Sequence, residues 1–281
     1  MSAYWFNPAW TTLRVFGPDA ISWLNGIVTC DVQACVAGDT VWGALLTKQG
    51  KVLAEFHVLY ELDSLYLVIA GGDPALALKV LDGLLVMEDA EVESSSRAFC
   101  WVTGESAQEE MTRLGLSGHP SAVFAQPAFL VGMEPGALVE LQATEDRLWW
   151  NPQQFEQLRI MSHVPRFGVD YDDHDNLHAA GLERKVVSWS KGCYLGQEVV
   201  CMQEMRGKVR RNVVALTLDQ PVTEQLPLAL KNSAGEVVGQ CTSLFGTTAL
   251  AKVTAPENQT GTRLDLASVD QVRLTSAVVV S

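Results

Sequence analysis

The chain has 281 residues, of which 48% are hydrophobic and 19% charged, a balance typical of an ordered protein with two or three domains. Its 33 acidic and 20 basic residues give a formal charge of -13, which disfavours direct binding to nucleic acid or to anionic membranes. No apolar run approaches the roughly 18 residues of a membrane span. The six cysteines are thinly spread, so reduced thiols and a cytoplasmic location are expected.

The first part of the chain predicts an α+β unit. Turn residues such as Gly17-Pro18-Asp19 and Gly72-Asp73-Pro74 precede helical patterns, and short β-rich runs lie between them. In chain order we expect a strand at 12–16, a helix at 20–28, strands at 41–47, 52–59 and 65–69, and a helix at 74–84.

The second part repeats this order of strands and helices, and the last part contains only β-rich runs. We expect a strand at 97–103, a helix at 105–114, strands at 122–131 and 137–142, a helix from Asn151-Pro152, and then strands at 212–218, 236–240, 248–253 and 271–275. The mixture predicts an α+β fold with antiparallel sheets and a small C-terminal β-barrel. The predicted domains are 1–95, 96–207 and 208–281, and the first two are allowed to interleave.

One octapeptide is hard to explain as packing alone. Lys191-Gly192-Cys193-Tyr194-Leu195-Gly196-Gln197-Glu198 combines two glycines, a thiol, a cation, a carboxamide and a carboxylate. Glycines let a backbone approach a ligand closely, Gln197 and Glu198 can bond the edge of a heterocycle, and a nearby cation favours the thiolate form of Cys193. From composition alone, a glycine-rich turn that carries an inert cysteine remains an equally good interpretation.

The octapeptide resembles the K-G-C-[FY]-x-G-Q-E signature of the YgfZ family, folate-binding relatives of the glycine-cleavage T-protein. Further similarities support it: Gly17 to Ala20 resembles the family's G-x-D-A element, and Thr29-Cys30-Asp31 resembles T-x-D. Gly50 lies where the family turns a hairpin, and Gly235 to Ser243 resembles a barrel strand of the family. The resemblance therefore covers nearly the whole chain.

This resemblance implies two ferredoxin-like α+β units and a C-terminal β-barrel in a T-protein-like three-domain ring around a folate pocket. It implies tetrahydrofolate or a derivative as ligand, and no bound metal or iron–sulfur cluster. The implied function is that of a folate-binding accessory protein for the assembly or repair of iron–sulfur enzymes, including enzymes that modify tRNA. Its implied partners are folate and those client enzymes.

The resemblance also implies site residues. Cys193 is the candidate reactive thiol, and the candidate folate-binding residues are Lys191, Gly192, Tyr194, Gly196, Gln197, Glu198, Arg159, Trp189 and Arg206. A surface position is an equally good interpretation for Arg159. Simple packing is an equally good interpretation for Trp189. The chain has Val200-Cys201-Met202 where the family has V-A-R, so Arg206, Lys208, Arg210 or Arg211 would have to supply the missing cation.

Three alternatives remain open. A folate-dependent aminomethyl-type transferase is disfavoured because aliphatic residues follow Gly50 where acids are expected, and because Met161 occupies the position of an expected glutamate. A folate-free module that docks RNA or protein would use the basic window at 183–211, where seven lysines and arginines outnumber three glutamates. A metal site at Asp172, His174 and His178 is explained more simply as a solvated acidic loop.

Overall fold

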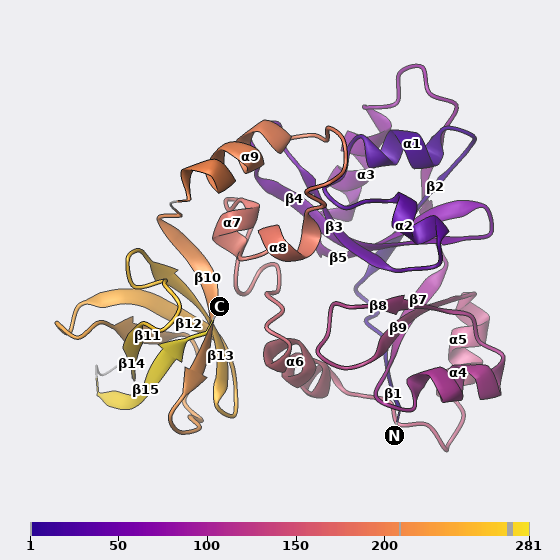
Figure 1. Ribbon diagram of the computed structural model, residues 1–281. Helices are drawn as coiled ribbons and strands as arrows, with labels where there is room; N and C mark the ends of the chain where they lie inside the picture. The colour runs from indigo at the N-terminus through magenta and orange to yellow at the C-terminus, as the bar shows by residue number, and fades with distance from the viewer. Residues whose placement is uncertain (1, 208, 269–271, 281) are drawn as a thin grey trace. The chain divides into compact units, whose positions relative to one another are not determined.

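The computed structural model describes residues 2–207, 209–268 and 272–280, so Lys208 and Gln271 lie outside the described residues. Its contacts divide the chain into two compact units, Met1–Phe155 with Lys185–Gln197, and Glu156–Arg184 with Glu198–Ser281. The predicted fold class is confirmed, because the chain forms mixed α/β sheets and a closed six-stranded C-terminal barrel (Figure 1). The three predicted domain boundaries stay a prediction.

The first unit contains a five-stranded antiparallel sheet with helices on one face (Figure 1). Its strands, in the order β3-β4-β5-β2-β6, are β3 (Val41–Leu46), β4 (Val52–Glu61), β5 (Ser64–Gly72), β2 (Thr11–Phe16) and β6 (Glu91–Ser95). Helices α1 (Ala20–Asn25), α2 (Gln33–Val36) and α3 (Pro74–Asp82) share a buried apolar cluster with this sheet. The predicted 41–59 hairpin is therefore β3 and β4.

The side chains of β4 alternate between two buried environments, one on each face of the sheet. Ala54, Phe56 and Val58 belong to the apolar cluster beneath the helices. Because successive side chains of a strand point to opposite faces, the buried residues Glu55 and His57 face the other side of the sheet.

The same unit contains a four-stranded sheet in the order β1-β7-β9-β8. Its elements are β1 (Ala3–Trp5), β7 (Ala98–Thr103), β8 (Gly118–Ser121), β9 (Ala128–Met133), α4 (Ala107–Leu114) and α5 (Pro135–Gln142). The strand predicted at 137–142 is wrong, because these residues form α5. Pro135 occupies the first turn, where its missing N–H costs nothing, and the alanine, leucines, glutamate and glutamine that follow are good helix formers.

The two sheets of the first unit meet through aromatic rings and a polar contact. His57 on β4 lies edge-on to Trp101 on β7, and Tyr66 on β5 lies beside Phe99. Glu61 at the end of β4 accepts hydrogen bonds from the Nε and Nη2 groups of Arg97 at 3.0 and 2.5 Å. The face of β4 that carries His57 is therefore covered within this unit.

The second unit is built around the barrel, whose strand order is β10-β13-β12-β11-β14-β15. Its strands are β10 (Arg211–Leu218), β11 (Leu228–Lys231), β12 (Val237–Phe245), β13 (Thr248–Thr254), β14 (Arg263–Ala267) and β15 (Arg273–Val279). Four helices precede the barrel: α6 (Pro152–Met161), α7 (Leu177–Ala180), α8 (Glu183–Val186) and α9 (Gln197–Arg206). Sequence patterns missed β11 and β14, which are short.

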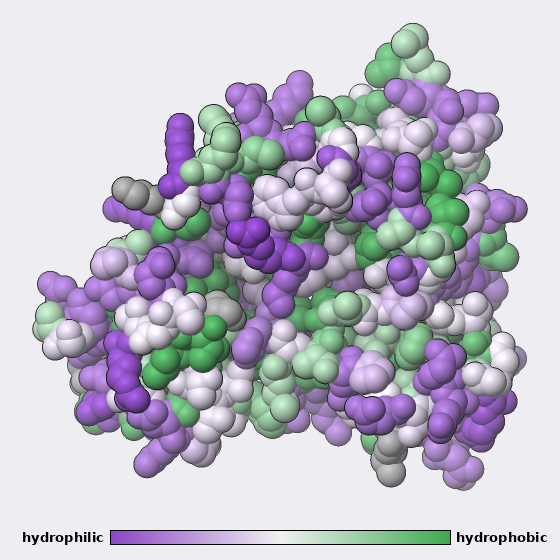
Figure 2. All heavy atoms as spheres, viewed as in Figure 1, coloured by the Kyte–Doolittle hydropathy of each residue, from purple (hydrophilic) through white to green (hydrophobic). Residues whose placement is uncertain are grey.

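Two surface features complete the description. No helix in the described part of the chain combines the length and the apolar character needed to cross a membrane. Figure 2 shows hydrophobic atoms at the tip of the loop that joins α3 to β6, where Val86 is 80% and Met87 93% exposed. The carboxylate of Glu88 accepts hydrogen bonds from both of their backbone N–H groups.

Candidate functional site

The octapeptide lies in a segment, residues 186–197, that we call the signature segment. It docks on residues 27–30 of the same unit through backbone groups on both sides of Cys193. The N–H of Ser188 donates to the carbonyl of Thr29 at 3.0 Å, and the N–H of Leu195 donates to that of Ile27 at 3.2 Å. The hydroxyl of Thr29 also donates to the carbonyl of Val186 at 2.7 Å. The segment is thus fixed at both ends.

Lys191 strengthens this anchoring. Its ammonium donates to the carbonyls of Val28 and Cys30, both at 2.7 Å, and lies 5.7 Å from the ring centroid of Tyr194. Burial lowers the pKa of Lys191 below its usual value. Two of its three N–H donors are therefore committed to backbone carbonyls, and the side chain holds the segment in place.

The two glycines of the octapeptide differ. Gly196 has a φ of +80° and lies so close to the hairpin that a Cβ there would be 2.7 Å from the carbonyl oxygen of Thr47. Gly192 has open space around its missing Cβ. Between them Cys193 is exposed, whereas Cys30 beneath the segment is buried and its pKa is raised by burial to about 12. Of these two thiols, only that of Cys193 is accessible to a reagent or partner.

The remaining predicted site residues are more scattered. Trp189 is 42% exposed and Tyr194 is buried. Gln197 opens α9 at the end of the first unit, and Glu198 and the exposed Arg206 lie on α9 within the second unit. These folate-binding assignments therefore stay predictions. The structure brings together only the predicted site residues between Trp189 and Gln197, which lie in the signature segment.

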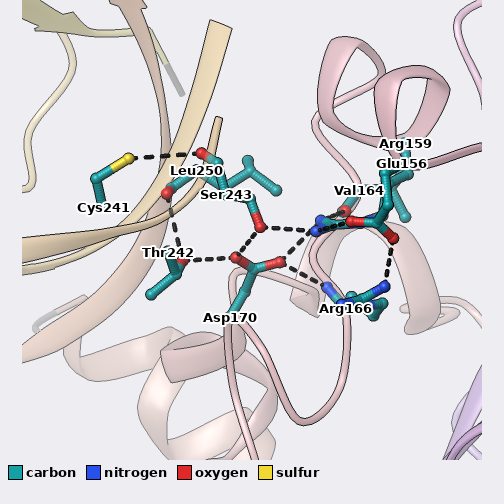
Figure 3. A network of polar contacts seen from close by, with 9 residues as sticks. All are labelled: Glu156, Arg159, Val164, Arg166, Asp170, Cys241, Thr242, Ser243 and Leu250. Carbon is teal, nitrogen blue, oxygen red and sulfur yellow. Dashed lines mark hydrogen bonds and ion pairs between the residues drawn. The ribbon is translucent and has the colours of Figure 1, made fainter. Parts of the chain in front are cut away.

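Arg159 on α6 lies in a buried polar network of the second unit (Figure 3). Its N–H groups donate to Glu156, to the carbonyl of Val164, to Asp170 at 2.9 Å and to Ser243 at 2.7 Å. Because a guanidinium has five N–H donors and each has an acceptor here, a folate carboxylate would have to displace one of them. The folate-binding role of Arg159 stays a prediction that requires this displacement.

Asp170 is the centre of that network. Its side chain is fully buried and accepts hydrogen bonds from the hydroxyls of Thr242 and Ser243 on β12, at 2.5 and 2.7 Å, and from the backbone N–H of Arg166 at 2.9 Å. Figure 3 shows these donors and Arg159 pointing at the carboxylate from different sides. The network therefore joins α6 and the loop after it to the barrel wall.

Sequence reasoning missed an aromatic cluster on the covered face of the five-stranded sheet. His57 stacks on Trp42 of β3, at 6.0 Å between ring centroids, and meets Trp101 edge-on at 5.1 Å. Trp10 lies 6.0 Å from the same imidazole. The cross-strand pairing of Trp42 with His57 could have been found from the hairpin register, but the contact with Trp101 could not.

Three nitrogens of this cluster are buried without a hydrogen-bond partner in the described structure: Trp42 Nε1, His57 Nδ1 and Trp101 Nε1. Buried polar atoms are normally paired with protein, water or a ligand, and leaving each unpaired costs about 1–3 kcal/mol. Two fixed N–H donors and one imidazole nitrogen between aromatic faces suit a flat heterocycle whose edge carries nitrogen and oxygen atoms. In their hydrogen-bonding chemistry these three nitrogens match the edge of a pterin ring.

Strand β3 connects this cluster to the signature segment. Trp42 and Ala44 are two residues apart on β3, and the N–H of Ala44 donates to the hydroxyl of Thr29 at 2.9 Å, which in turn bonds Val186. Glu55 is the cross-strand partner of Ala44 and is buried on the same face as His57. The candidate site is thus the face of β3 and β4 that carries the cluster, with the signature segment at its edge.

The acidic loop before α7 does not gather metal ligands. The side chain of His174 is 90% exposed, whereas that of His178 is buried and lies 3.2 Å from Glu204. Within the described residues, no group of three or more His, Cys, Asp and Glu side chains is arranged to hold a metal ion. The exposed position of His174 agrees with a solvated acidic loop.

No family model matches this chain. It is 26% identical over 247 residues to the tRNA-modifying protein YgfZ of Vibrio atlanticus (strain LGP32), covering 81% of this chain and 74% of that protein. It is 27% identical over 246 residues to the protein of the same name from Edwardsiella ictaluri (strain 93-146), covering 78% and 71%.

Among solved structures, the glycine cleavage system aminomethyltransferase T from Bartonella henselae has the same fold. The TM-score is 0.83 and the match covers 100% of this chain and 85% of that one. The sequences are only 17% identical, so this similarity describes the fold alone.

Proposed function

Because this chain is a relative of the YgfZ proteins, built on the fold of the glycine-cleavage T-protein, we propose that it is a cytoplasmic tetrahydrofolate-binding accessory protein. In this role it supports the assembly or repair of iron–sulfur enzymes, including enzymes that modify tRNA. The relatives' name, tRNA-modifying protein, supports the tRNA connection.

The observation that carries the folate proposal is the set of unpartnered nitrogens on Trp42, His57 and Trp101. In this proposal the pterin ring of tetrahydrofolate receives hydrogen bonds from the two indoles and stacks on the cluster, which excludes water from the ring. Burial lowers the pKa of His57 to about 3. Its imidazole therefore stays neutral at neutral pH, so it can accept as well as donate a hydrogen bond.

The signature segment supplies the second part of the proposal. Its backbone bonds to residues 27–30 and the Lys191 ammonium hold the exposed Cys193 beside the folate site. When bound, the folate would supply one-carbon chemistry. This chain's own contribution is to present the thiol to a client protein from a fixed position.

A calorimetric titration of the reduced protein with tetrahydrofolate tests the ligand. We expect saturable binding, weakened about fivefold by Trp42→Phe, since this change keeps the aromatic ring and removes one neutral hydrogen bond worth about 1 kcal/mol. The matched control is Trp149→Phe, because the Nε1 of Trp149 is also buried without a partner but lies against the apolar cluster of α4 and α5. No binding, or equal weakening by both variants, would contradict the proposal.

The fold similarity to an aminomethyltransferase makes a folate-dependent one-carbon transferase the second candidate. Glu55 is buried on the site face of β4, where Glu61 is already paired with Arg97 and His119, whereas Ala54 lies in the opposite core. Turnover of methylenetetrahydrofolate with a small amine, lost in Glu55→Gln, would favour this candidate over the accessory role. The accessory role predicts binding without turnover.

A further inference from the structure

Thr29 is a fully buried residue whose polar groups are shared between strand β3 and the signature segment. On the strand side, its N–H donates to the carbonyl of Ala44 at 3.1 Å, and its hydroxyl accepts from the N–H of Ala44 at 2.9 Å. On the other side, its hydroxyl donates to the carbonyl of Val186 at 2.7 Å, and its carbonyl accepts from the N–H of Ser188 at 3.0 Å. Thr29 therefore bonds both elements twice.

The position of β3 in its sheet makes this link important. In the described structure β3 is the end strand, with β4 on one side, and the outer edge of such a strand has unpaired backbone groups unless another segment covers it. Residues 29 and 30 cover it at Ala44 and Gly43, where a Cβ on Gly43 would lie 2.4 Å from the Sγ of Cys30. The hydrogen bonding of the sheet thus continues through Thr29 to the signature segment.

The same strand carries one wall of the aromatic cluster. Trp42 lies two residues before Ala44 on β3, about 7 Å away along the strand, and their side chains share one face of the sheet. A ligand that pairs with the buried Nε1 of Trp42 has to be released before this part of β3 can open, so binding slows the opening. Slower opening of β3 preserves the bonds between Ala44 and Thr29, and with them the attachment of the signature segment.

We propose that Thr29 is a positioning residue that couples ligand binding at the aromatic cluster to the position of Cys193. The inference rests on the proposed folate function and adds a regulation to it, because the exposed thiol is held more rigidly when the heterocycle is bound. Lys191 bonds the carbonyls of Val28 and Cys30, whereas Thr29 also bonds β3. Thr29 is therefore the residue through which the ligand acts on the segment.

Hydrogen exchange of the wild type, measured for single amides with and without saturating tetrahydrofolate, tests the coupling without any substitution. The N–H groups of Ala44 and Ser188 both donate to Thr29, so one local opening exposes both. We expect the ligand to slow both amides by at least about threefold. Slowing at Ala44 without slowing at Ser188 would overturn the proposal.

Substitution of Thr29 tests its hydroxyl. Thr29→Val keeps the size of the side chain and removes two of the four bonds, so the ligand should slow Ser188 by only about 1.5-fold or less. The amides shared by β3 and β4 should still be slowed, and Thr29→Ser, which keeps the hydroxyl, should behave as the wild type. Thr103→Val is the matched control, because the buried Thr103 hydroxyl also donates to a carbonyl, that of Pro127, and accepts from Gln126.

A nitroxide label on Cys193, in a Cys201→Ala background, measures the motion of this position directly. Tetrahydrofolate should lengthen the correlation time of the label at least about twofold with Thr29 or Thr29→Ser, and by clearly less with Thr29→Val. Equal lengthening in all three proteins would mean that the ligand itself contacts the label, and would overturn the coupling through Thr29.

Calorimetric titration of the wild type separates the two ways in which this inference can fail. Absence of saturable tetrahydrofolate binding would overturn the proposed function and this inference with it. Saturable binding that leaves Ser188 exchange and the Cys193 label unchanged would overturn this inference alone. Circular dichroism and a thermal melt establish that each variant is folded, and the wild-type exchange measurement decides the question if Thr29→Val is not.

Discussion

His57 couples the candidate site to the stability of the protein. Burial lowers its pKa to about 3, whereas an unfolded histidine titrates near 6.5. Below about pH 6.5 the unfolded chain binds a proton that the folded chain does not bind. This histidine therefore lowers the free energy of unfolding as the pH falls from about 6.5 toward 3, and has no such effect above 6.5.

We expect His57→Phe to lose less stability on acidification than the wild type does. Between pH 6 and pH 4 the slope of the unfolding free energy against pH should differ between the two proteins by up to about 1.4 kcal/mol per pH unit. This is the contribution of one proton. Urea unfolding at pH 7, 6, 5 and 4 measures it. His174→Gln is the control, because the His174 side chain is 90% exposed, and an unchanged slope in His57→Phe would contradict this account.

Asp170 provides a second test at the scale of a residue. Asp170→Asn should lower the free energy of unfolding by about 3–5 kcal/mol, because it removes the fully buried one of the two carboxylates that pair with the Arg159 guanidinium. Denaturant unfolding of this variant should be compared with that of Asp173→Asn, whose side chain is 69% exposed. Equal effects of the two changes would mean that the network contributes little to the free energy of unfolding.

The anchoring of the signature segment is a property of elements. We expect Lys191→Met to accelerate hydrogen exchange about tenfold or more at the amides of Ser188 and Leu195, because two charge-assisted bonds to residues 28 and 30 are lost. Lys185→Met, an exposed change just before this segment, should leave exchange unchanged. Exchange that is unaltered in Lys191→Met would show that Lys191 does not hold the segment.

The two glycines allow a matched comparison. Gly196→Ala should destabilise the protein by about 1–3 kcal/mol, because a non-glycine residue is strained at a φ of +80° and its Cβ would meet the Thr47 carbonyl at 2.7 Å. Gly192→Ala should cost less, since nothing lies within 4 Å of its Cβ position. Thermal melts of both variants decide this, and a larger loss in Gly192→Ala would contradict the packing described here.

Local patterns predicted those elements that local chemistry determines. The hairpin of β3 and β4 follows from alternating β-rich runs around a turn, and α3 follows from Asp73, whose side chain accepts hydrogen bonds from two N–H groups of the first turn. The segment at 137–142 was misassigned because its apolar residues suit either a strand or a helix, and the structure forms α5 there.

Contacts between distant parts of the chain could not be predicted from sequence. β1 pairs with β7, far away in the chain, and the aromatic cluster forms only where the two sheets meet. The sequence identified the octapeptide but not the anchoring contacts of Lys191, because its acceptors are backbone carbonyls of residues 28 and 30. Any residue has such carbonyls, so no sequence motif marks them.

For the molecule as a whole, stability and activity are expected to respond separately to a change at Cys193. This thiol is exposed, so Cys193→Ala should change the melting temperature little while abolishing support of iron–sulfur enzymes in cells. Complementation of a strain that lacks this protein measures that support, with Cys201→Ala as the matched control. Full rescue by Cys193→Ala would remove the thiol from the function.

The most direct test of the central claim is hydrogen exchange of the whole protein with and without tetrahydrofolate. Since a ligand slows exchange where it binds, the account predicts protection of peptides that cover residues 41–59 and 186–197. Protection should be weaker in Trp42→Phe than in the wild type. Protection confined to the barrel, or no protection at saturating tetrahydrofolate, would contradict a folate site on β3 and β4.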